Sequence, residues 1–120
     1  LWYRSSKIHH VVGEILFHAN CLYTGDYMPN LANNMIDLKS YYRIQWPYID
    51  ILQVPHHGSI ENYHDDLYQP AKDCFISSNI AKSYGHPDKQ VENNIQAHGC
   101  YCQIVTENPI TKLEYYYRFV

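Results

Sequence analysis

Three short polar segments of the sequence contain residues that could bind a metal ion. Two of them directly follow a predicted strand, and the third lies between a predicted strand and a predicted helix. Asp26 ends a Thr-Gly-Asp segment, and His56 and His57 open a His-His-Gly-Ser segment. His86 lies in a Tyr-Gly-His-Pro segment. One aspartate with several histidines is a ligand set suited to Zn²⁺, and also to Mn²⁺ or Fe. The segments therefore predict a metal site if the fold brings them together.

Short apolar runs would position these segments. Apolar alternation predicts a β-hairpin with strands at 11–18 and 21–24. A β-branched run at 49–54, ended by Pro55, predicts a strand that is mostly buried on both faces, and 74–78 predicts another. If the strands before the polar segments run parallel, all three segments meet at one sheet edge, where open α/β sheets bind ligands.

Helical spacing of apolar residues predicts a helix over 31–44, with Asn30 as its N-cap. Pro87 is expected at the first position of a second helix, which Gly99 ends. Polar residues 56–70 read as a loop with one helical turn near 63–67, and two further strands are expected, at 100–106 and 111–119. Strands alternating with helices predict a layered α/β (α+β) fold with a mixed sheet, as one domain spanning 1–120.

The composition is that of a folded domain. The 120 residues are 46% hydrophobic and 18% charged, enough for one modest core. The formal charge of −3 gives no broad electrostatic footprint for nucleic acid. No apolar run reaches about 18 residues, so we expect no membrane segment and a cytoplasmic location. The four cysteines are expected to be buried reduced thiols rather than a disulfide or a cysteine-based zinc site.

Each polar segment also has an ordinary structural explanation. Asp26 suits a turn, the histidine pair suits a solvated loop, and His86 suits a helix cap. Their joint placement at successive strand ends favours a site instead. The remaining histidines have no such support and are interpreted as surface or strand-face residues: His9, His10, His18, His64 and His98.

In order and spacing, residues 8–118 resemble the metallo-β-lactamase superfamily. The segments that carry the resemblance run from Leu22 to Asp26, from Ile51 to Ser59, over Ser77 and Ser78, and from Tyr84 to Pro87. The closest branch is the hydrolase domain of competence proteins, which belong to DNA-uptake channels. The resemblance implies the C-terminal half of an αββα sandwich, with helices on one face of a mixed sheet.

The resemblance also implies roles for individual residues. Asp26 matches the aspartate that bridges two divalent metal ions, with Zn²⁺ favoured over Mn²⁺ or Fe. His56 matches a later histidine ligand, with His57 as the alternative, and His86 matches a histidine near the substrate phosphate or the metal rim. The implied reaction is attack of a metal-bridging hydroxide on a phosphodiester, which makes nucleic acid a candidate substrate.

One departure from the family pattern is large. The His-x-His-x-Asp-His motif of the N-terminal half has no counterpart here. The expected partner is therefore that missing half, on the same or a separate chain, because a lone half leaves one apolar sheet face uncovered. Two alternatives stay open: a degenerate binding or assembly module, and a hydrolase of another ester class on the same fold. The sequence also leaves the oligomeric state open.

Overall fold

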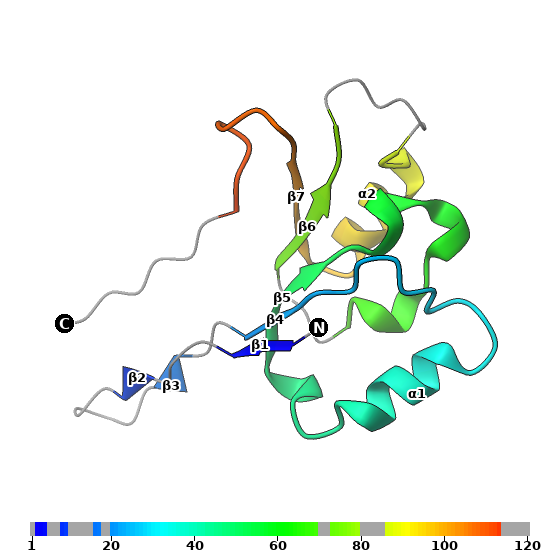
Figure 1. The fold of residues 1–120 in the computed structure, drawn as a ribbon, viewed down its shortest axis with the longest axis vertical. Helices are drawn as coiled ribbons and strands as arrows, with labels where there is room; N and C mark the ends of the chain where they lie inside the picture. Colours follow the sequence, from blue (N-terminus) through cyan, green and yellow to red (C-terminus); the bar gives the residue numbers. More distant parts are fainter. Residues whose placement is uncertain are drawn as a thin grey trace.

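A computed structural model of the chain describes residues 2–4, 8–9, 16–17, 20–69, 73–79 and 86–113. Within these residues the main sheet has five strands in the order β1-β4-β5-β6-β7 (Figure 1). Neighbouring strands from β4 to β7 run parallel, and β1 pairs antiparallel with β4, so the predicted mixed sheet is confirmed. The strands are β1 (Trp2–Arg4), β4 (Asn20–Leu22), β5 (Ile49–Gln53), β6 (Asp73–Ser77) and β7 (Tyr101–Val105).

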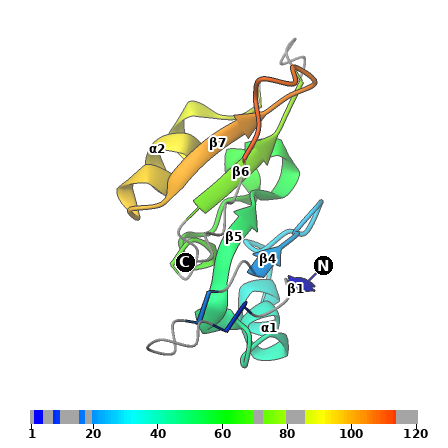
Figure 2. The same ribbon diagram turned by 90° about the vertical axis from the view of Figure 1, so that its left-hand side faces the viewer.

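The two helices, α1 (Asn34–Tyr41) and α2 (Lys89–Ala97), lie on the same face of this sheet. Figure 2 shows the sheet toward the viewer and both helices behind it. This arrangement confirms the layered α/β class.

The core fills the space between the sheet and the helices. From the sheet, Leu52, Cys74 and Ile76 are fully buried, and Val91 and Ile95 of α2 meet them. Val91 and Ile95 are four residues apart, which places both side chains on one face of the helix. Ile51, Gln53 and Phe75 point to the other face of the sheet and are half-buried, so β5 is less buried on that face than predicted.

The helix ends differ from the predictions at the start of α2 and at both ends of α1, which ends at Tyr41 rather than at residue 44. The Asp88 carboxylate accepts a hydrogen bond of 2.9 Å from the Gln90 amide, so Asp88 is the N-cap of α2 and Pro87 lies before the helix. Pro87 was predicted inside the helix, which is wrong. Gly99 does follow the C-cap of α2, with a φ of +78°, as predicted.

Helix α1 begins later than predicted and Asn30 does not cap it. Hydrogen-bonded turns occupy the preceding residues, with Leu31 donating to Met28 and Asn34 donating to Leu31. Ala32 has a φ of +45°, which no helical residue adopts. These turns delay the helix to Asn34, and the Asn30 amide instead donates to the Glu61 carbonyl.

The predicted hairpin is wrong in its pairing. Strand β4 lies between β1 and β5, whereas β3 (Leu16–Phe17) pairs with β2 (Ile8–His9). Of the strand predicted at 11–18, the described residues include only Leu16 and Phe17, which form β3. The strands predicted at 49–54, 74–78 and 100–106 are confirmed to within one residue.

The loop predicted at 56–70 holds short 3₁₀ turns: η2 (Pro55–Gly58), η3 (Ile60–Asn62) and η4 (Asp65–Leu67). A further turn, η1 (Trp46–Tyr48), precedes β5. A last strand was predicted at 111–119, but residues 111–113 form no strand. The rest of that predicted strand lies outside the described residues.

None of the four cysteines forms a disulfide, as predicted, and all but the half-buried Cys102 are buried. Burial raises the pKa of the Cys74 thiol and raises that of Cys102 to about 11, so both remain protonated at neutral pH. In the described part of the chain, neither helix has the length and hydrophobicity of a membrane span.

Candidate functional site

Asp26 and His56 come together at the carboxyl edge of the sheet. Asp26 lies in the turn after β4, and His56 lies in η2 after the neighbouring parallel strand β5. One carboxylate oxygen of Asp26 lies 3.8 Å from Nδ1 of His56. The Asp26 side chain is 83% exposed and that of His56 is 21% exposed, so the pair opens to solvent on the aspartate side. The predicted convergence of these two segments is therefore present.

Hydrogen bonds fix the two segments to each other. The His56 amide donates to the Gly25 carbonyl over 3.0 Å. The Thr24 hydroxyl donates to the Gln53 carbonyl over 2.6 Å, and the Gly25 amide donates to the Gln53 side-chain oxygen over 2.9 Å. Sequence reasoning did not single out Gln53, because a glutamine on a strand face carries no motif.

The backbone of η2 is strained. His56 and His57 both adopt left-handed conformations, with φ values of 48° and 54°, and Gly58 continues at +79°. A left-handed conformation costs a residue with a side chain about 1–2 kcal/mol. Strain of this kind persists where the surrounding structure enforces it, and it clusters at functional sites. The two imidazoles make different contacts: His56 lies beside Asp26, whereas His57 lies beside Ser77.

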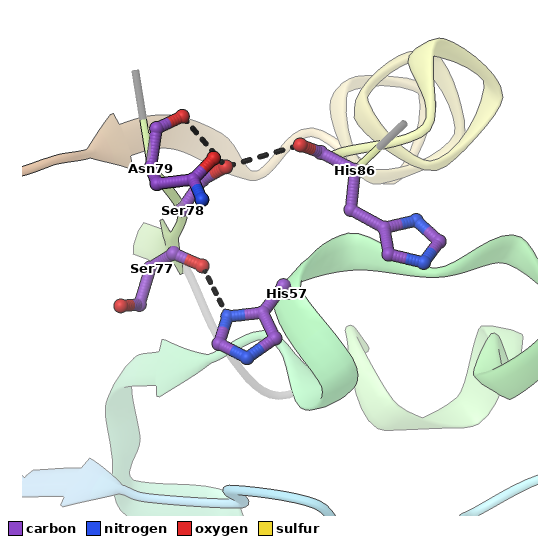
Figure 3. A pocket seen from close by; sticks show the side chains of 5 residues that line it. All are labelled: His57, Ser77, Ser78, Asn79 and His86. Atoms are coloured by element: carbon purple, nitrogen blue, oxygen red, sulfur yellow. Dashed lines mark hydrogen bonds between the residues drawn. The ribbon is translucent and has the colours of Figure 1, made fainter. Parts of the chain in front are cut away.

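His57 lines a pocket of about 290 Å³ (Figure 3). Its Nδ1 lies 2.7 Å from the Ser77 carbonyl oxygen. Because a carbonyl can only accept, Nδ1 must carry the proton and donate it, which leaves Nε2 of the neutral ring as a proton acceptor. The pocket is lined by His57, Ser77, Ser78, Asn79 and His86, which come from η2, the end of β6 and the segment before α2.

His86 closes the far side of this pocket. The Ser78 hydroxyl donates to its carbonyl over 3.0 Å, which ties the segment before α2 to the end of β6. Its ring Nδ1 is buried and has no hydrogen-bond partner among the described residues, and the same holds for Nε2 of His56. Leaving such an atom unsatisfied costs about 1–3 kcal/mol. Both atoms are enclosed by the chain itself, so each is a buried ring nitrogen next to the candidate site that the described part of the chain leaves unsatisfied.

The predicted site residues thus form two neighbouring pairs. Asp26 pairs with His56, and His57 shares a pocket with His86. In the described ranges, no group of three histidine, cysteine, aspartate or glutamate side chains is placed to hold one metal ion. His98 instead pairs with Asp65 over 3.0 Å, and His64 caps η4, in agreement with structural roles. His10 and His18 lie outside the described residues.

Comparison of the chain with protein-family models, with curated proteins and with solved structures found no match.

Proposed function

We propose that this chain supplies Asp26 and His56 to the metal centre of a hydrolase that cleaves phosphodiesters. The observation that carries the proposal is the 3.8 Å separation between the Asp26 carboxylate and Nδ1 of His56. The two atoms come from different strand ends and meet at the sheet edge where α/β proteins bind ligands.

The size of that separation favours a shared ion over a direct hydrogen bond. A hydrogen bond from a ring nitrogen to a carboxylate spans at most about 3.2 Å. Two ligand atoms bound at about 2.1 Å to one tetrahedral ion stand about 3.4 Å apart. A shift of a few tenths of an ångström would therefore seat both atoms on one ion. The exposed carboxylate of Asp26 has the freedom to make that shift.

The described residues fit part of such a centre. A catalytic zinc site uses three protein ligands and keeps a fourth position for water or substrate. Asp26 and His56 provide two, so the proposal requires further ligands from the N-terminal half that the resemblance implies.

When bound, the metal would lower the pKa of a coordinated water and stabilise negative charge on the substrate. The chain's own residues would do the rest. His57, with its proton held on Nδ1 by Ser77, presents Nε2 to accept a proton. The choice of phosphodiesters among ester substrates rests on the resemblance.

The test combines metal binding with hydrolysis. In the protein completed by its N-terminal half, equilibrium dialysis against Zn²⁺ and Mn²⁺ is expected to give stoichiometric metal for the wild type and for Asp37→Ala. The Asp37→Ala variant is a control that removes an exposed carboxylate on α1. Asp26→Ala and His56→Ala are expected to weaken binding by at least tenfold, about the loss that even outer-shell changes cause.

Hydrolysis of single-stranded DNA and of bis(p-nitrophenyl) phosphate is measured in the protein completed by its N-terminal half, with and without chelator. We expect activity that chelator abolishes and that Asp26→Ala lacks. Activity that survives chelator or Asp26→Ala overturns the proposal. Metal binding without hydrolysis of either substrate overturns the choice of phosphodiesters and favours a hydrolase of another ester class. Absence of stoichiometric metal in the completed protein overturns the metal centre and favours a degenerate binding or assembly module.

A further inference from the structure

Three hydrogen bonds anchor the turn that carries Asp26 to β5 and to the following η2, and two of them end on Gln53. The carbonyl of Gln53 accepts from the Thr24 hydroxyl, and its side-chain oxygen accepts from the Gly25 amide. The third joins the His56 amide to the Gly25 carbonyl. Gln53 therefore contacts the residues on one side of Asp26 while lying three positions before His56.

Asp26 has little else to fix its position. Its side chain is 83% exposed, and within the described residues its carboxylate accepts no hydrogen bond; its one recorded contact is the 3.8 Å approach to His56. The place of the carboxylate is thus set by the backbone of the turn. Among the described residues, no heavy atom lies within 4 Å of a β-carbon added at Gly25, so the hydrogen bonds of its amide and carbonyl hold this side of Asp26 in place. On the other side of Asp26, Tyr27 packs against the core.

The side chain of Gln53 takes no part in the core. Its neighbours Leu52 and Val54 are buried against the helices, at 0% and 3% exposure, whereas Gln53 points to the other face of the sheet and is half-buried. Removing its amide would open no cavity among the core residues. A loss of site geometry on substitution would therefore be separable from a loss of folding.

We propose that Gln53 is a positioning residue, whose side-chain oxygen holds the Gly25 amide and thereby keeps the Asp26 carboxylate beside His56. The geometric part of this inference stands alone. Its consequence for metal affinity rests on the proposed function.

The substitution Gln53→Leu removes the acceptor while keeping the bulk of the side chain, and Gln53→Glu restores an acceptor oxygen. Gln103→Leu is the matched control, because Gln103 is a half-buried glutamine at the equivalent register position of β7, two strands away. The geometric readout is the set of nuclear Overhauser contacts between the His56 ring and the protons of Gly25 and Asp26, together with the chemical shift of the Gly25 amide proton.

In Gln53→Leu, we expect those contacts to be lost and the resonance of the Gly25 amide proton to move upfield. In Gln53→Glu and Gln103→Leu, we expect the contacts and the chemical shift to stay as in the wild type. Contacts that survive in Gln53→Leu overturn the inference. In Zn²⁺ titrations of the same proteins, Gln53→Leu is expected to bind at least about tenfold more weakly than the wild type, and Gln103→Leu to match it. Equal affinities would contradict the link to the metal.

The two failures are distinguishable. If the wild type binds no Zn²⁺ through Asp26 and His56, the proposed function fails, and the contacts to the His56 ring still decide whether Gln53 positions the turn. If those contacts are unchanged in Gln53→Leu, the positioning role fails, while Zn²⁺ binding by the wild type still supports the proposed function.

Discussion

Gly58 packs so closely against Pro87 that a β-carbon on Gly58 would stand 2.9 Å from that of Pro87. The Gly58 carbonyl also accepts a hydrogen bond of 3.0 Å from the Asp88 amide. These contacts hold the segment with His56 and His57 against the segment with His86. The spacing of the histidines in the pocket therefore depends on a glycine that itself carries no chemistry.

Substituting Gly58 with alanine should destabilise the fold strongly. The new methyl group would meet Pro87 and would lie 3.3 Å from two atoms of Ile76, in a backbone conformation with φ of +79°. Overpacking costs about 1–3 kcal/mol and the left-handed conformation about 1–2 kcal/mol, so we expect a loss of about 2–5 kcal/mol. Urea unfolding followed by circular dichroism measures it.

Gly99→Ala is the control for that experiment. Gly99 has nearly the same φ, +78°, but nothing lies within 4 Å of an added β-carbon. Its substitution should cost only the conformational part, about 1–2 kcal/mol. Equal losses for the two variants would show that the contact with Pro87 is not what constrains Gly58.

The carboxylate of Asp65 should contribute stability that acid removes. The Tyr63 hydroxyl donates to Asp65 over 2.6 Å and His98 lies 3.0 Å away, and these two hydrogen bonds hold the pKa of Asp65 below its usual value. The charged form is therefore favoured by folding. Its contribution is complete above the usual aspartate pKa of about 4 and is lost as the pH falls through the lower pKa of the folded state.

Comparison of the wild type with Asp65→Asn by urea unfolding measures this contribution. The difference in unfolding free energy is expected to be small, because Asp65 is exposed, and to be larger at neutral pH than in acid. A difference that grows on acidification would contradict the assignment of these hydrogen bonds.

The proton of the neutral His57 ring should reside on Nδ1. The Ser77 carbonyl, 2.7 Å away, accepts only from a protonated Nδ1. The ¹⁵N shifts of the ring distinguish the two tautomers directly. We expect a protonated Nδ1 and a bare Nε2, and His64→Ala should leave the pattern unchanged. A ring protonated on Nε2 would remove His57 as the proton acceptor of the pocket.

The sequence was sufficient to predict the sheet edge but not the local geometry at it. The run from Ile49 to Val54, closed by Pro55, is a strong local signal, and parallel pairing then brings the ends of β4 and β5 together. Pairing of β4 with β1 rather than with the segment just before it depends on tertiary packing. No local pattern reports such a choice.

The left-handed backbone at His56 and His57 likewise escaped prediction. It depends on how Gly58 fits against Ile76 and Pro87, which are distant in the chain. The hydrogen bond from the Gly25 amide to the Gln53 side chain, which joins the turn after β4 to β5, was not predictable either. The residue types of the candidate site were readable from the sequence, whereas their orientations come from contacts between strand ends.

Whether Asp26 and His56 bind one ion together is measured by a Zn²⁺ titration of the completed protein, followed through the ¹⁵N ring resonances of its histidines. We expect the His56 ring resonances to shift with added Zn²⁺, the shift to disappear in Asp26→Ala, and the resonances of His64 and His98 to stay unchanged. His56 resonances that do not respond to Zn²⁺, or that respond equally in Asp26→Ala, would show that the two residues share no ion.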